Sequence, residues 1–282
     1  MVLESLNIAI LQKRPFLALL IGFTYTLVGF GVGIIFFPWQ VSLAMLFLTT
    51  LLLVPSLMKI LSVEEKRESM DGLYHFFKDH RDVAEIYISL FIGIFFAYVV
   101  LGLLFVPSEV RFNTVFHYQI QFLEKQEGLS GALITGFLEK PPEYTIQQFL
   151  GLWEYNLTVG LIFFVLSLAY GAGSIFLAVL NASIFASFMV YVIDFLAKKT
   201  AHVYTILGIF MIHLIPEVMG FLLTTIAGGV ISKALIREKW GSAAFQNVLR
   251  DSVTLLCIAV IFLFVAAWLE VYVTRSLFYG MF

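Results

Sequence analysis

The sequence has little charge and almost no cysteine. Only 13% of its 282 residues are charged, the net charge is -2, and Cys257 is the one cysteine. A single cysteine excludes an internal disulfide, and a thiol inside an apolar run stays protonated, which argues against thiol chemistry. The small net charge, without a basic face, gives no electrostatic footprint for nucleic acid. We therefore expect no nucleic-acid partner.

Long apolar segments make up most of the chain. Hydrophobic residues account for 61% of it, and the mean hydropathy is +0.96. Several runs reach or exceed the roughly 20 residues that a helix needs to cross a bilayer. This composition is typical of integral membrane proteins of the helical kind. We predict an all-α, polytopic transmembrane bundle of about seven spans, located in the cell membrane and in contact with membrane lipid.

Two spans open the chain after a short leader that ends at Arg14. They are expected over residues 16–37 and 40–58, with a turn at Pro38. The charge-free run that holds both spans is too long for a cleavable signal, so we interpret it as a retained anchor. Residues 1–58 are thus predicted to form an amino-terminal leader and a transmembrane hairpin.

Small residues mark helix-packing stripes in several predicted spans. In a membrane, small side chains allow two helix backbones to approach closely. The candidates are Gly22, Gly29, Gly33, Gly171, Gly173, Gly220 and Gly228. In the first span, the stripe can contact another helix of the same chain, which we favour, or a second copy of the chain in a homodimer.

Residues 59–85 form the densest charged stretch of the chain. Positive and negative side chains alternate there, which is typical of a solvated helical connector on the cytoplasmic side. His75 and His80 lie among these carboxylates, but their spacing from Asp71 and Asp79 matches no strong metal signature. We therefore interpret this stretch as a wet surface.

A third span is expected over residues 86–106, followed by an outer segment, 107–154. This segment is too apolar for a simple solvated loop. Residues 129–138 are too short to cross a bilayer and suit an interfacial or re-entrant piece. Residues 145–155 have an apolar face and resemble a helix lying in the headgroup region. We favour flat membrane anchors over the alternative, in which these pieces line the entrance to a central cavity.

Residues 155–193 carry no charge. A single helix of that length would overshoot the hydrocarbon by roughly 20 Å or more. Gly171 and Gly173 provide a turn, so we expect a helical hairpin, with a broken single span as the alternative. Asn156 starts one arm of this hairpin and Asn181 lies inside the other. Three further segments are then predicted: a span within 200–232, a loop over 233–250, and a last span over 253–272.

The span within residues 200–232 carries one formal charge, Glu217, and His213 lies four residues before it. On a helix these two side chains lie one turn apart on the same face. A carboxylate near the middle of a bilayer costs roughly 3 kcal/mol on insertion scales, so Glu217 must face protein or a water-filled cavity. Pro216 removes a backbone N–H and crowds the preceding turn, and we expect a kink there.

We predict a buried polar network around this pair. Its members are His213, Glu217, Asn181 and Asn156. A metal site is less favoured, because the zincin pattern has two histidines and this helix turn has one. His202 lies about 16 Å away along a straight helix, and we expect no second carboxylate to be buried nearby. No metal and no cofactor are therefore predicted, with His213 and Glu217 as weak metal candidates.

The distribution of lysine and arginine predicts the orientation. With a cytoplasmic amino terminus, the inner side holds Lys13, Arg14, Lys59, Lys66, Arg67, Lys78, Arg81, Lys233, Arg237, Lys239 and Arg250. The outer side then holds Arg111, Lys125, Lys140, Lys198, Lys199 and Arg275. The positive-inside rule favours this arrangement, which places the carboxyl terminus outside.

Several short motifs occur in one order along the chain. They are Asn156-Leu157-Thr158-Val159-Gly160, Gly171-Ala172-Gly173, Asn181-Ala182-Ser183, His213-Leu214-Ile215-Pro216-Glu217 and Ala227-Gly228-Gly229. Together they resemble the stage II sporulation protein M family of bacterial and archaeal membrane proteins, over about residues 86–272. Ala182 and Leu214 stand where the family pattern has glycines. The resemblance implies a membrane domain over residues 86–282, to which the first hairpin is an addition.

The resemblance also implies a role in a membrane complex, because the family's namesake works with cell-wall-degrading enzymes during engulfment in spore-forming bacteria. We favour a non-enzymatic scaffold or assembly protein, acting in a membrane-remodelling or envelope complex with a partner or as a homodimer. Two alternatives stay open. One is a transporter, channel or lipid-handling protein that uses Glu217 as an intramembrane proton or cation site. The other is an intramembrane metalloenzyme.

Overall fold

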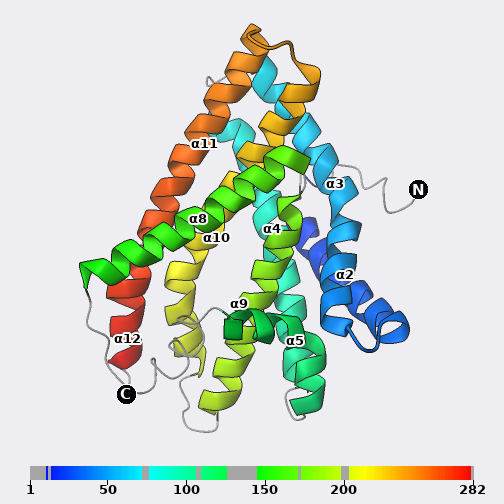
Figure 1. Ribbon diagram of the computed structural model, residues 1–282, viewed down its shortest axis with the longest axis vertical. Helices are drawn as coiled ribbons and strands as arrows, with labels where there is room; N and C mark the ends of the chain where they lie inside the picture. The colour runs from blue at the N-terminus through cyan, green and yellow to red at the C-terminus, as the bar shows by residue number, and fades with distance from the viewer. Residues whose placement is uncertain are drawn as a thin grey trace.

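The protein is described by a computed structural model that covers residues 11, 14–71, 76–105, 109–125, 145–170, 173–197 and 203–280. The regular secondary structure of these residues is entirely helical, which confirms the prediction of an all-α protein (Figure 1). The elements are α2 (Phe16–Phe36), α3 (Val41–Asp71), α4 (Phe76–Phe105), α5 (Glu109–Lys125), α8 (Ile146–Tyr170), α9 (Ser174–Ala197), α10 (Val203–Arg237), α11 (Ala243–Trp268), the π-helix η2 (Leu269–Thr274) and α12 (Arg275–Tyr279).

Six helical stretches in the described part of the chain are long and apolar enough to cross a membrane. Five of them lie in α2, α3, α4, α8 and α10, and the sixth runs from α11 into α12. Helix α9 contains a shorter apolar stretch, Ser174–Val190, and takes the place of the remaining predicted span. Helices are the expected form here, because hydrocarbon offers no water to satisfy backbone polar groups. The predicted multi-pass bundle is confirmed.

The predicted turns fall where proline and glycine interrupt the apolar runs. Helix α2 ends at Phe36, two residues before Pro38, and α3 begins at Val41. Helix α8 ends at Tyr170 and α9 begins at Ser174, which makes residues 155–193 part of a hairpin. Pro216, by contrast, lies inside α10, and the helix continues through it.

Residues 59–71 of the charged stretch continue α3, and residues 76–85 begin α4. Two predicted boundaries are wrong. The expected loop over 233–250 is reduced to residues 238–242. Residues 146–155 are the first turns of α8 and do not form a separate flat helix. Helices α3 and α10 continue past their apolar runs, because charged helix formers propagate a helix that packing has already started. The predicted piece 129–138 and His75 lie outside the described residues.

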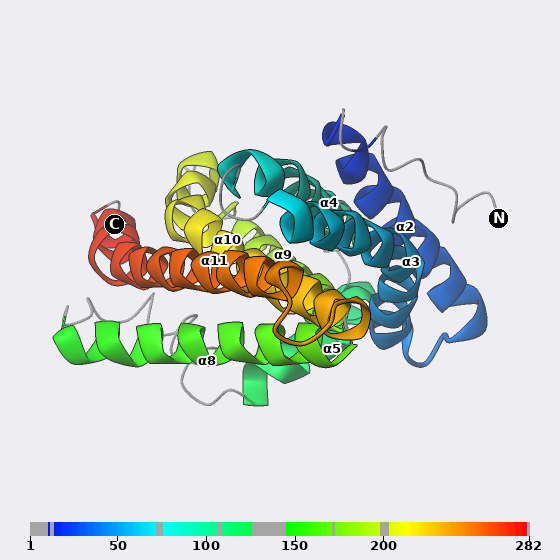
Figure 2. The same cartoon turned by 90° about the horizontal axis from the view of Figure 1, so that it is seen from above.

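The chain passes back and forth between two ends of the bundle (Figure 1). The α3–α4 and α10–α11 junctions lie at one end, whereas α5 and the carboxyl terminus lie at the other. Helix α10 packs along α11 and α8 and also contacts α3, α9 and α4. Seen from above, α8 runs alongside α11, and α2 lies at the opposite side of the bundle, against α3 and α4 (Figure 2).

The glycines of α2 contact helices of the same chain. A Cβ on Gly22 would lie 2.5 Å from the Leu90 carbonyl oxygen of α4, and one on Gly29 would lie 3.0 Å from the Met45 carbonyl oxygen of α3. Gly33 faces Val41 at 3.4 Å, also on α3. These contacts fit packing within one chain.

Further glycines serve the other helix pairs. A Cβ on Gly220 would lie 2.5 Å from Leu263 of α11, and one on Gly228 would lie 2.5 Å from the Phe164 carbonyl oxygen of α8. Gly173, in the turn before α9, faces the Leu166 carbonyl oxygen at 2.7 Å. Gly171 lies outside the described residues. Close backbone approach of α10 to both α8 and α11 therefore depends on small residues.

Gly22→Ala should loosen the contact between α2 and α4. The added methyl group meets backbone, which cannot move aside as a side chain can, and we expect a loss of about 1–3 kcal/mol in unfolding free energy. Gly31→Ala is the matched control, because nothing lies within 4 Å of its Cβ position on the same helix. Thermal unfolding of the detergent-solubilised protein measures both. Equal melting temperatures for the two variants would contradict the close packing.

Candidate functional site

His213 and Glu217 lie one turn apart on α10 and face the end of the last span. The Nδ1 atom of His213 lies 3.0 Å from the Thr274 hydroxyl oxygen. That hydroxyl is fully buried and donates a long, 3.5 Å hydrogen bond to the Ile209 carbonyl oxygen. The Thr274 hydroxyl therefore lies in contact with both the His213 ring and the Ile209 backbone of α10.

The π-helix η2 brings a second carboxylate to the same place. The Arg275 N–H donates to the Glu270 carbonyl oxygen, so one turn spans five residues. Arg275 then stands over Glu270, and its Nη2 donates to Glu270 Oε1 at 3.3 Å. His213, Glu217 and Glu270 each offer a ligand atom, and these atoms lie within 4.8 Å of one another. We call these three residues the α10–η2 cluster.

The expectation that no second carboxylate lies near Glu217 is wrong. Glu270, which falls near the end of the predicted last span, lies beside His213 and Glu217. Two features account for this. Helices α10 and α11 are antiparallel, with Gly220 against Leu263 and Ile209 against Thr274. The wider π-turn then aligns Glu270 and Arg275, which an α-helical register does not do.

The two predicted asparagines lie on other helices. Asn156 is buried on α8, and its amide nitrogen has no hydrogen-bond partner among the described residues. Gly160 of the same helix packs against Phe221, so the parallel register of α8 and α10 brings Asn156 to the level of Glu217. Asn181 is half-buried on α9. No hydrogen bond joins either asparagine to His213 or Glu217 in the described part of the chain.

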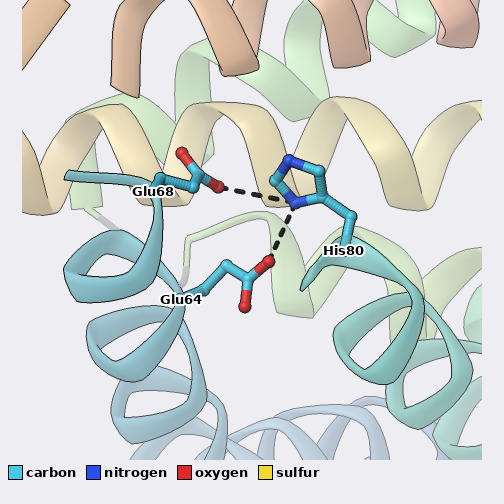
Figure 3. A group of neighbouring side chains, drawn as sticks. All are labelled: Glu64, Glu68 and His80. Carbon is cyan, nitrogen blue, oxygen red and sulfur yellow. Dashed lines mark ion pairs between the residues drawn. The ribbon is translucent and has the colours of Figure 1, made fainter. Parts of the chain in front are cut away.

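A second cluster lies at the opposite end of the bundle, where a wet surface was expected. Glu64 and Glu68 of α3 and His80 of α4 point toward one another (Figure 3). Their side chains are 0%, 1% and 6% exposed, so the prediction of a solvated surface is wrong for them. We call these three residues the α3–α4 cluster. Spacing along the chain does not predict it, because Glu64 and Glu68, which His80 contacts, come from another helix.

Arginine side chains border this second cluster. Arg67 lies 4.0 Å from Glu64 and 3.7 Å from Asp82. The neighbouring Glu65, which is buried, accepts a 2.9 Å hydrogen bond from Arg237 at the end of α10. Helix α10 is thereby tied to α3 at this end and to η2 at the other.

A third polar contact joins α3, α5 and α9. Ser42 donates to the Gln119 side-chain oxygen at 2.7 Å, and the Gln119 amide nitrogen donates to Ser183 at 2.9 Å. All three side chains are buried. Beside this contact, residues of the α2–α3 turn and α5 line a pocket of about 220 Å³. No sequence pattern predicts this contact, because each residue alone is an ordinary polar side chain.

Together, these observations define a multi-pass helical membrane protein with ionisable groups enclosed between helices at both ends of the bundle. The chain belongs to the stage II sporulation protein M family, whose model matches residues 88–275. The match begins within α4 and ends at Arg275, so it includes the α10–η2 cluster and leaves out α2 and α3. No curated protein matches the chain. No solved structure matches it either.

Thr274→Val should weaken the attachment of η2 to α10. The substitution keeps the shape and removes the hydroxyl that contacts both His213 and Ile209, so we expect a loss of about 1 kcal/mol in unfolding free energy. Thr158→Val is the control, because the exposed Thr158 hydroxyl donates to the Glu154 carbonyl of its own helix and joins no second helix among the described residues. Denaturant unfolding in mixed micelles measures the difference. An effect no larger than that of the control would contradict the link.

Proposed function

We propose that this member of the family is a non-enzymatic membrane scaffold, which holds partners together in an envelope or membrane-remodelling complex. One observation carries the proposal. Two residues of the α10–η2 cluster are used in structural contacts: His213 of α10 meets Thr274 of η2, and Glu270 pairs with Arg275 across the π-turn of its own helical segment. Contacts of this kind fix the rotation and register of a helix, as a scaffold requires.

The surface of the bundle supports the same proposal. Only 28% of the membrane-spanning window of α2 and 22% of that of α8 is buried inside the chain. The other faces of these two helices are apolar and lie at opposite sides of the bundle (Figure 2). In a membrane such faces contact lipid or the helices of a partner. A rigid bundle that exposes the apolar faces of α2 and α8 suits assembly with a membrane partner or with a second copy of the chain.

A cation or proton carrier is the second candidate. It is favoured by the proximity of His213, Glu217 and Glu270, whose ligand atoms lie within 4.8 Å of one another. Intramembrane ionisable groups commonly serve ion and proton pathways. A metalloenzyme would use the same three ligands. The scaffold is preferred because Arg275 pairs with Glu270 and Thr274 contacts His213, so two of the three groups already take part in structural contacts.

Glu217→Gln separates these functions, because it keeps the shape of the side chain and removes its charge. For a scaffold, we expect chemical cross-linking in membranes to recover the same oligomer or complex from the variant and from the unmodified protein. Proteoliposomes loaded with a pH-sensitive dye should show no proton or cation flux with either protein. A flux that depends on pH and is lost in Glu217→Gln would contradict the scaffold and support the carrier.

The proposed orientation places the α3–α4 and α10–α11 junctions in the cytoplasm. A cysteine introduced by Lys239→Cys, in the exposed α10–α11 turn, should then resist a membrane-impermeant maleimide in intact cells. One introduced by Trp39→Cys, where the native side chain is 92% exposed at the opposite turn, should react. Both are made in a Cys257→Ala background, because Cys257 is exposed on α11. The reverse labelling pattern would overturn the orientation.

A further inference from the structure

A polar pocket opens between the α2–α3 turn and α5, away from both clusters of ionisable groups. Its volume is about 220 Å³, and it is lined by residues 38–43 and by Asn113, Thr114, His117 and Tyr118 of α5. The turn and α5 lie at the same end of the bundle (Figure 1). Sites that enclose a whole drug-sized ligand measure roughly 300–1,000 Å³. This pocket therefore suits one ring-sized group.

Hydrogen bonds fix one wall of the pocket. The Ser42 hydroxyl donates to the Gln119 side-chain oxygen at 2.7 Å and accepts a 3.2 Å hydrogen bond from the Tyr118 backbone N–H. The Gln119 amide nitrogen donates to Ser183 of α9 at 2.9 Å. These contacts join α3 and α5 to a third helix, so the walls are held in place without a ligand. A pre-formed pocket loses little conformational freedom when it binds one.

The lining is polar but carries no lysine, arginine, aspartate or glutamate among the described residues. Gln40 and Asn113 are exposed, and each offers an acceptor oxygen and two N–H donors. Trp39, almost fully exposed, adds an aromatic face and an N–H at the rim. Neutral donors and acceptors beside an aromatic face match a sugar ring, which has hydroxyls at its edge and C–H groups on its faces. A phosphate group is typically bound by arginine or lysine.

An apolar surface adjoins the pocket. Ile35 and Phe36 end α2 just before the turn, and their side chains are 72% and 70% exposed. The membrane-spanning window of this helix is mostly unburied as well. Trp39 lies next to this surface, and tryptophan is enriched where a protein crosses the membrane–water interface. A polar pocket joined to an exposed apolar helix face has the two parts that a lipid requires, whereas a free sugar would use the pocket alone.

We propose that this pocket binds the uncharged, hydroxyl-rich headgroup of a membrane glycolipid, whose acyl chains lie along the exposed end of α2. Gln40 and Asn113 form hydrogen bonds with the sugar hydroxyls, and Trp39 packs against a C–H face of the ring. The α2–α3 turn lies before residue 88, where the family match begins, and α5 lies within the match. The site thus depends on the added hairpin, and it does not depend on the scaffold function.

Photolabelling of the full chain in nanodiscs tests this proposal. The discs contain phosphatidylcholine and a small fraction of monoglucosyl diacylglycerol with a photoreactive group on its sugar, and labelled residues are mapped by mass spectrometry. We expect saturable labelling within residues 38–43 and 113–118. Trp39→Ala and Asn113→Ala should each lower the apparent affinity about fivefold, the effect of losing one ring contact or one hydrogen bond.

Two matched controls separate the pocket from the bilayer surface. Trp240→Ala removes an exposed tryptophan at the opposite end of the bundle, and Gln147→Ala removes an exposed amide of α8; both should label as the unmodified chain does. The four altered side chains are exposed, and melting temperatures check that each variant folds. If Trp39→Ala lowers labelling and Asn113→Ala does not, Trp39 is an interfacial anchor only and the headgroup site is overturned.

Competition identifies the ligand class. Unlabelled monoglucosyl diacylglycerol should displace the probe, whereas phosphatidylglycerol and soluble methyl glucoside should not. Equal displacement by phosphatidylglycerol would overturn the uncharged headgroup, and equal displacement by methyl glucoside would overturn the lipid source. Labelling spread evenly over α2 and α8, without saturation at the pocket, would remove the site altogether. None of these outcomes bears on the cross-linking and flux measurements that test the scaffold.

Discussion

A carboxylate enclosed between apolar helices must be neutralised, and the bundle depends on how its two ends meet that requirement. Helix α10 takes part at both ends. Near its start, His213 and Glu217 meet Glu270 and Thr274 of η2, and at its end Arg237 holds Glu65 of α3. Between these two ends, glycines of α10 allow α8 and α11 to approach it closely. These polar contacts set the register of α10 against its neighbours, and the packing of small residues stabilises that register. Both are needed because, in lipid, the hydrophobic effect does not drive helices together.

Much of the fold could be predicted because its signals are local. Hydropathy locates the spans, Pro38 ends α2, and the glycines after Tyr170 separate α8 from α9. The pairing of His213 with Glu217 in one cluster also follows from a spacing of four residues on a single helix. Helix ends were less predictable. Charged residues beyond an apolar run are good helix formers, so α3 and α10 continue past the points where hydropathy falls.

The partners of the ionisable residues could not be predicted, because they come from other helices. His80 lies among acidic neighbours in the sequence, yet it contacts Glu64 and Glu68 from the preceding helix. Mixed positive and negative charge is typical of a solvated surface. In this segment it occurs in α3 and α4, which bury Glu64, Glu68 and His80 against each other. The proximity of Glu270 to His213 was not predicted for a different reason. The π-turn changes which residues share a helix face, and no sequence pattern predicts that turn.

The two clusters look alike in composition, but they connect different elements. In the α10–η2 cluster, His213 and Glu217 of α10 lie beside Glu270, which pairs with Arg275. In the α3–α4 cluster, Glu64 and Glu68 of one helix meet His80 of the next, and Arg67 lies beside Glu64 and Asp82. Since removing one partner of a buried charged pair is costly, each cluster constrains the rotation of the helices that contribute to it.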